Sequence, residues 1–130
     1  MIFAASYVLP ISSPPIPGGA VAVENGVITA VGPLKELRAS CSDPVTELPG
    51  CTITPGFVNA HTHLELTHFP AWKVRKELDY LPKTYVDWIQ QVVKIRRALH
   101  ADDLELSVRE GVRLCLESGT TAIGEILTDF

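Results

Sequence analysis

Alternating apolar and polar residues predict short strands in the first part of the chain. Two apolar runs, residues 20–23 and 27–31, flank the pair Asn25-Gly26. Asn and Gly both tolerate positive φ, so this pair between β-branched segments is the strongest short-range signal for a β-hairpin. A loop, a short helix and a short strand are expected around the hairpin, at residues 11–19, 34–40 and 45–48. The pattern up to about residue 51 therefore predicts a small β-rich unit.

The second part of the chain has the longer period of amphipathic helices. Val86, Ile89 and Val93 recur at helical spacing, which predicts a helix over residues 85–99. Asp102 and Asp103 favour the start of a second helix, through capping and through charge at its N-terminus. Its apolar stripe is expected at Leu104, Val108, Val112, Cys115 and Leu116, with Gly119 as the C-terminal cap.

Two strands are expected to flank these helices. Phe57 and Val58 form an apolar run before the helices, and residues 120–126 form another after them. Residues 68–83 show no clear period and contain two prolines, so we expect a loop that forms a wall of a site. A strand, helices and a strand in this order make one βαβ unit of a parallel sheet.

The candidate chemistry lies in the stretch from Thr54 to Leu66, where His61-Thr62-His63 follows the first of these strands. Residues two apart on a strand point to the same side, so both imidazoles would share one face. Imidazole is the commonest ligand of zinc, iron and nickel centres. The strand's far end is where parallel α/β folds place function, so we interpret His61 and His63 as metal ligands. The alternative is a pair of core histidines bonded to backbone carbonyls.

Composition and charge exclude several functional classes. The chain has 130 residues, 46% of them hydrophobic and 20% charged, with a net charge of −4. These values are typical of a globular protein, and no clustered basic face suggests nucleic-acid binding. No apolar run has the length of a membrane helix, and no signal peptide is indicated.

Cysteine usage points to a reducing compartment. The three cysteines, Cys41, Cys51 and Cys115, are widely spaced and fit neither a disulfide framework nor a zinc finger. We therefore expect reduced thiols in a cytoplasmic protein.

Together the motifs resemble the start of an amidohydrolase-superfamily enzyme. The resemblance is carried by the hairpin at residues 19–32, by Pro55-Gly-Phe-Val-Asn-Ala-His-Thr-His63, and by Gly-Thr-Thr-Ala-Ile-Gly-Glu-Ile at residues 119–126. It implies an α/β fold: the start of a (β/α)8 TIM barrel, at residues 53–130, preceded by part of a small β-sandwich domain, at residues 1–52. A complete barrel needs about 250 residues, so we interpret the chain as the N-terminal part of a longer enzyme or a truncated product of one.

Within the superfamily the chain is similar to the deaminase and chlorohydrolase branch. His-Thr-His-Leu-Glu-Leu-Thr and the later Val86-Asp-Trp-Ile89 resemble aminodeoxyfutalosine and S-adenosylhomocysteine deaminases. The resemblance implies hydrolysis of an amino group from a purine- or pyrimidine-type ring by a metal-bound hydroxide. Zinc is the expected metal, with iron(II) as the alternative. Removal of chloride, opening of a cyclic amide, and a non-catalytic scaffold role stay open as rival hypotheses.

The resemblance also assigns site residues. It makes His61 and His63 two of the metal ligands, whereas the remaining ligands and the proton-transferring Glu belong to later strands, so no catalytic acid or base is expected within these 130 residues. From the residue spacing, Glu65 lies two residues beyond His63 and would share its inward side if the strand continued. Glu65 and Trp88 are therefore candidates for substrate contact; the alternatives are a solvated loop carboxylate and a core aromatic. Glu125 is a candidate for supporting the metal ligands without binding the metal.

The expected partner is a small-molecule substrate, with no nucleic acid and no membrane. Uncovered helices and a two-strand edge would expose apolar surface, which favours association into a homo-oligomer. We expect residues 1–130 alone to lack deaminase activity, because two ligands make only half of a catalytic zinc site.

Overall fold

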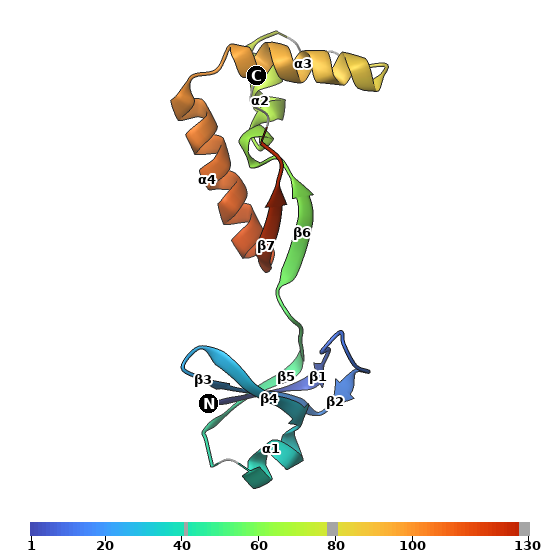
Figure 1. Cartoon of the computed structure of the whole chain (residues 1–130), viewed down its shortest axis with the longest axis vertical. Helices are drawn as coiled ribbons and strands as arrows, with labels where there is room; N and C mark the ends of the chain where they lie inside the picture. Colours follow the sequence, from blue (N-terminus) through green and yellow to red (C-terminus); the bar gives the residue numbers. More distant parts are fainter. Residues whose placement is uncertain (41, 78–80, 128–130) are drawn as a thin grey trace. The chain divides into compact units, whose positions relative to one another are not determined.

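The computed structural model describes residues 1–40, 42–77 and 81–127, and it divides the chain into two compact units, Met1–Pro55 and Gly56–Phe130 (Figure 1). Each unit has its own sheet, so the described residues form a mixed α/β fold. They do not form a closed barrel. The division falls after Pro55, slightly beyond residue 52, because the last strand of the first unit continues to Ile53.

The first unit is a five-stranded sheet with one helix. Strand β1 pairs antiparallel with β2 and β3, and parallel with β5, while β4 pairs antiparallel with β3. The elements in chain order are β1 (Ile2–Val8), β2 (Ile16–Pro17), β3 (Gly19–Glu24), β4 (Val27–Pro33), α1 (Leu34–Ser40) and β5 (Val45–Ile53).

The predicted hairpin is confirmed as β3 and β4. Asn25 and Gly26 have φ of 51° and 78°, the left-handed conformation that their residue types favour. The short helix at residues 34–40 is also confirmed as α1. Turn chemistry and helical spacing therefore predicted these local elements correctly.

The prediction for the strands around the hairpin was incomplete. Strand β1 was not anticipated, and the loop expected over residues 11–19 contains β2 and the start of β3. The strand expected to end before Pro49 continues to Ile53, across a register shift between β5 and β1. Gly50 has φ of 72° there, and its N–H donates to Ser6 Oγ at 3.0 Å. A bulge of this kind lets a strand pass a Pro-Gly pair without ending.

One face of this sheet packs against α1. The buried cluster is formed by Ile2, Ala4, Ala20, Ala22 and Leu37, with Leu34 and Val45 packed at its edge. Small alanines on adjacent strands allow the helix to approach the sheet closely. Ile2 is fully buried and belongs to the centre of this core.

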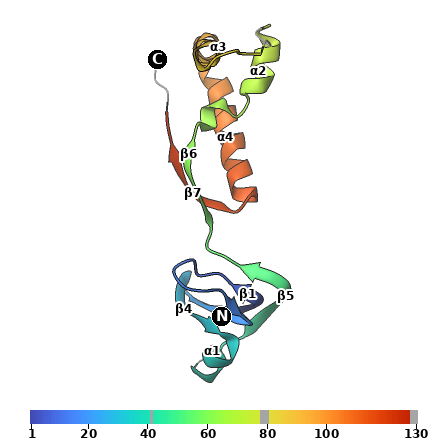
Figure 2. The same ribbon diagram turned by 90° about the vertical axis from the view of Figure 1, so that its right-hand side faces the viewer.

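The second unit is a two-stranded parallel sheet with four helical segments. They are, in chain order, β6 (Phe57–Thr62), the 3₁₀ turn η1 (Leu64–Leu66), α2 (Phe69–Arg75), α3 (Tyr85–Arg97), α4 (Ala101–Glu117) and β7 (Thr120–Glu125). Strands β6 and β7 are parallel neighbours, and α4 lies along one face of the pair (Figure 2). The predicted strand–helix–strand unit is therefore confirmed.

Residues 68–83, expected as a loop, contain the helix α2. Pro70 is the second residue of this helix, where a missing N–H costs no hydrogen bond, so this proline favours a helix start and not a break. Residues 78–80 of the expected loop lie outside the described residues.

Helix α3 is confirmed, and its predicted apolar stripe is partly right, because Ile89 and Val93 are half-buried. Val86 is 60% exposed, while Val92 and Ile95 are 3% and 1% exposed. Val92 and Ile95 pack with Phe69 and Trp72 of α2. We call these four residues the α2–α3 cluster. The partner of α3 is α2, which was not predicted, so Val92 and Ile95 were left out of the predicted stripe.

The stripe predicted for α4 was also partly wrong. The buried residues of the helix are Ser107 and Gly111, whereas Val112 and Leu116 are 40% and 68% exposed. The helix begins at Ala101, and Asp103 accepts a hydrogen bond from the His100 N–H at 3.2 Å. Gly119 has φ of 77°, as expected for a C-terminal cap.

Small residues allow the elements of this unit to approach one another. A Cβ on Gly111 would lie 2.6 Å from Thr67 Oγ1, and one on Gly124 would lie 2.5 Å from the Ala60 carbonyl oxygen. Both distances are shorter than the contacts that a methyl group makes with an oxygen atom in proteins. Gly111 thus lets α4 contact the segment after β6, and Gly124 lets β7 lie against β6.

None of the helices within the described ranges is both long and apolar enough to cross a membrane.

Gly124→Ala is expected to lower the free energy of unfolding of this unit by about 1–3 kcal/mol, because its methyl group would collide with the β6 backbone. Urea denaturation followed by tryptophan fluorescence measures the effect, since Trp72 and Trp88 both belong to this unit. The matched control is Ala122→Val, which enlarges an exposed position on the same strand. An unchanged urea midpoint for Gly124→Ala would show that the strands do not need this close approach.

Candidate metal centre

The two histidines of the motif lie at the carboxyl end of β6. The strand ends at Thr62, and His63 begins the turn into η1. The imidazole rings of His61 and His63 have centroids 5.2 Å apart and planes inclined at 80°. His61 is exposed and His63 is half-buried. The predicted pairing of the two rings on one side is therefore present in the structure.

A hydrogen bond to a backbone carbonyl fixes the ring of His63. Its Nδ1 lies 2.7 Å from the carbonyl oxygen of Ile126, the residue after β7. A carbonyl oxygen only accepts hydrogen bonds, so Nδ1 carries a proton, and in the neutral ring Nε2 is then the nitrogen with the free lone pair. This is the arrangement that metal-binding histidines adopt in proteins.

Two carboxyl groups lie beside the imidazoles. Glu125, the last residue of β7, accepts a hydrogen bond from the Leu64 N–H at 2.8 Å. Glu65 is only 4% exposed, and its carboxyl group is next to that of Glu125. The strand does not continue to Glu65, because η1 begins at Leu64 and turns this side chain into the interior. Substrate contact by Glu65 stays a prediction.

Burial raises the pKa of the Glu125 carboxyl above its ordinary value. The hydrogen bond from Leu64 opposes this shift, the neighbouring Glu65 adds to it, and the nearby His63 lowers the pKa. The protonated form of Glu125 is therefore easier to populate than that of a free carboxyl group.

Helix α4 supports the same segment from its other side. Ser107 is fully buried; its hydroxyl donates to the Leu64 carbonyl at 3.3 Å and accepts from the His68 N–H at 3.0 Å. Thr67 Oγ1 also donates to the Leu64 carbonyl, at 2.7 Å. Sequence reasoning missed Ser107, and its only signal was a small polar residue within an apolar helical pattern.

The second candidate for substrate contact, Trp88, is half-buried. It packs against the α2–α3 cluster, and its ring centroid lies 5.8 Å from that of Tyr85. His68 precedes α2 and lines a cavity of about 240 Å³ together with Trp72 and Asp103. A substrate-binding role for Trp88 stays a prediction.

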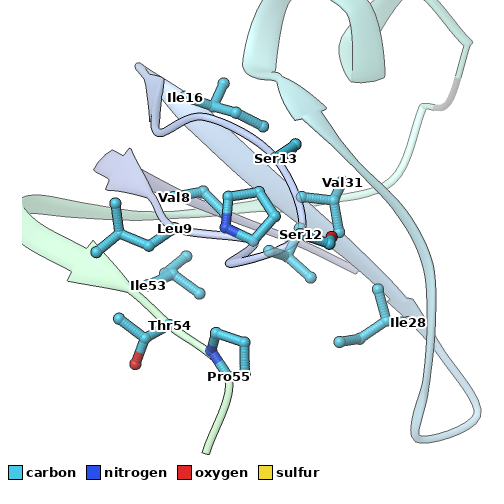
Figure 3. Close-up of a pocket in the computed structure, with 12 residues that line it drawn as sticks. Val8, Leu9, Ser12, Ser13, Ile16, Ile28, Val31, Ile53, Thr54 and Pro55 are labelled. Carbon is cyan, nitrogen blue, oxygen red and sulfur yellow. The ribbon is translucent and has the colours of Figure 1, made fainter.

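A cavity of about 420 Å³ in the first unit has different chemistry (Figure 3). Its lining is mainly aliphatic, with Ile16, Ile28, Val31 and Ile53 pointing into it. None of the twelve residues that line it carries a carboxylate, an imidazole, a thiol or a basic group. The histidine pair of the second unit is therefore a better candidate for a chemical site than this cavity.

The residues present fit part of a zinc centre. Catalytic zinc usually has three protein ligands and a water molecule. Within the described ranges no group of three His, Cys, Asp or Glu residues is placed to hold a metal ion. His61 and His63 would therefore supply two of the ligands, and His63 would bind through Nε2 because Nδ1 is bonded to the Ile126 carbonyl.

Comparisons with known proteins show what this chain is similar to. Residues 19–40 match the family model described as "Imidazolonepropionase-like composite domain, bacteria". A 5-methylthioadenosine/S-adenosylhomocysteine deaminase of Nitratidesulfovibrio vulgaris is 33% identical over 110 residues, which are 83% of this chain and 23% of that protein. The chain therefore spans about a quarter of the length of that relative.

Two solved structures have a similar fold. The adenosine deaminase of Xanthomonas campestris with bound zinc is 31% identical, with a TM-score of 0.63 over 97% of this chain and 28% of that one. The Helicobacter pylori aminofutalosine deaminase in complex with methylthio-coformycin has a TM-score of 0.75 at 20% identity, over 97% of this chain and 29% of that one. The second likeness concerns the fold alone.

The sequence relatives, the zinc-bound structure and the paired histidines after β6 lead to the same assignment. The resemblance expected from the motifs is confirmed. The chain belongs to the amidohydrolase superfamily and is homologous to the N-terminal region of its adenosine-type deaminases.

Proposed function

We propose that this chain is the N-terminal portion of a metal-dependent deaminase that removes an amino group from a purine- or pyrimidine-type ring by hydrolysis. In this proposal β6 and β7 are the first two strands of a (β/α)8 barrel, and the first unit is part of a β-sandwich. The observation that carries it is the pairing of His61 with His63 at the carboxyl end of β6, with His63 Nδ1 bonded to Ile126. Active sites of such barrels lie at this end of the strands.

His61 and His63 would hold the metal, which we propose to be zinc, as in the relative from Xanthomonas campestris. A bound zinc ion supplies Lewis-acid activation of water at neutral pH. His63 contributes an oriented Nε2, because its other nitrogen is held by the Ile126 carbonyl. His61 is the more accessible of the two rings.

The buried carboxyl groups would serve the site without binding the metal. Glu125 holds the Leu64 amide, and Glu65 lies against it. Proton transfer to the leaving amino group is assigned to no residue of this chain, because its carboxylates near the histidines are buried and bonded to the protein.

Zinc binding to the chain is expected to depend on both histidines. His61→Ala and His63→Ala should each weaken binding by at least about tenfold, or on the order of 1.4 kcal/mol, because each removes one of two ligands. Isothermal titration of the metal-free chain with zinc measures the affinity.

The matched control is His100→Ala, which removes an exposed imidazole at the start of α4 and should leave the affinity unchanged. Zinc affinity that survives the double replacement of His61 and His63 would contradict their role as ligands.

Deaminase activity is expected from the complete protein that contains this chain and not from residues 1–130 alone, which provide two of the ligands. Ammonia release is measured over aminopurines, aminopyrimidines and adenosyl compounds, before and after chelation and zinc addition. His63→Ala in the complete protein should lower the rate by at least about a hundredfold, on the order of 2.7 kcal/mol.

A zinc-loaded complete protein that releases no ammonia from this panel would contradict the deaminase proposal. Release of chloride from a chlorinated triazine, or opening of a cyclic amide, would instead support one of the rival hydrolase hypotheses.

A further inference from the structure

Three hydrogen bonds join the end of β7 to the histidine motif. The Ile126 N–H donates to the Thr62 carbonyl at 2.9 Å, His63 Nδ1 donates to the Ile126 carbonyl at 2.7 Å, and the Leu64 N–H donates to Glu125 Oε1 at 2.8 Å. Two consecutive residues at the end of β7, Glu125 and Ile126, thus hold three consecutive residues at the end of β6, from Thr62 to Leu64. Besides the His63 ring itself, only Glu125 takes part in these bonds through its side chain, so it can be replaced without removing a proposed ligand.

The Leu64 amide is the point at which the conformation of His63 is set. His63 has φ of −130° and ψ of 80°, between the extended conformation of β6 and the helical conformation of η1. The peptide that follows His63 is therefore turned out of the strand ladder, and its N–H needs a partner elsewhere. Leu64 is 6% exposed, so water is a poor substitute for that partner.

We propose that Glu125 is a positioning residue for the proposed metal centre: by holding the Leu64 amide it fixes the backbone after His63, and thereby the ring of His63 against the Ile126 carbonyl. This inference rests on the proposed function for its consequence in metal binding. Its geometric part concerns the metal-free chain and stands on the three hydrogen bonds alone.

The length and setting of Glu125 suit this role. Residue 125 is the register partner of Thr62, so its side chain starts level with the residue before His63 and reaches forward to the amide of Leu64. A neutral amide at this position keeps an acceptor oxygen, whereas an alanine provides none and an aspartate is shorter by one methylene group. Comparing glutamine with aspartate at this position therefore distinguishes the effect of the hydrogen bond to Leu64 from the effect of having any polar side chain there.

The first readout is the tautomer of His63 in the metal-free chain, from long-range ¹H–¹⁵N spectra of the imidazoles. The unchanged chain and Glu125→Gln should show His63 protonated at Nδ1. Glu125→Ala and Glu125→Asp should show a mixture of tautomers, because the ring is no longer held against Ile126.

The second readout is zinc affinity. Glu125→Ala and Glu125→Asp should weaken the zinc affinity by about 10- to 100-fold, as loss of an outer partner of a metal ligand does. Glu125→Gln should keep the affinity of the unchanged chain. Val92→Ala, in the α2–α3 cluster, is the control for a general loss of stability and should change the affinity by less than about threefold.

An unchanged tautomer and unchanged affinity in Glu125→Asp would overturn the proposal, and this variant decides the matter if Glu125→Ala does not fold. Equal weakening by Val92→Ala would also overturn it, because the effect would then follow stability. If the unchanged chain binds no zinc, the proposed function fails, while the tautomer measurement still tests the positioning role.

Discussion

The parallel pairing of β6 with β7 is the interaction on which the candidate metal centre depends. It places Thr62 beside Glu125, so the chain leaves both strands at the same level. Backbone groups beyond the last pair of a parallel ladder have no partner within the ladder. Here the Leu64 N–H is bonded to the Glu125 carboxyl group, and the Ile126 carbonyl is bonded to the His63 ring. The geometry of the site is therefore a consequence of how two strands end.

Close packing around this pairing is provided by residues with small side chains. Gly124 allows β7 to lie against the β6 backbone, and Gly111 allows α4 to contact Leu64 and Thr67. The Ser107 hydroxyl on α4 donates a hydrogen bond to the Leu64 carbonyl, and the Glu125 carboxyl group accepts one from the Leu64 N–H. The N–H and the carbonyl of Leu64 are thus both hydrogen-bonded within the protein, which restricts the backbone next to His63.

Much of this arrangement could be predicted from local sequence signals, and the rest could not. The geometry of the Asn25-Gly26 turn and of the His61–His63 pair could be predicted, because each depends on residues close in the chain. The buried face of α3 depends on α2, which Pro70 had seemed to exclude although the second position of a helix tolerates it. The meeting of Glu65 with Glu125 depends on where β6 ends, and no periodicity reveals that.

The central claim is that His61 and His63 act together as ligands of one metal ion. X-ray absorption spectroscopy of the zinc-loaded chain tests it most directly, because imidazole rings give a distinctive multiple-scattering signal. The geometry predicts two imidazole nitrogens at about 2.0–2.1 Å from zinc, with oxygen from water completing the shell. A shell with one imidazole or none, or with thiolate sulfur at about 2.3 Å from the exposed Cys51, would contradict it.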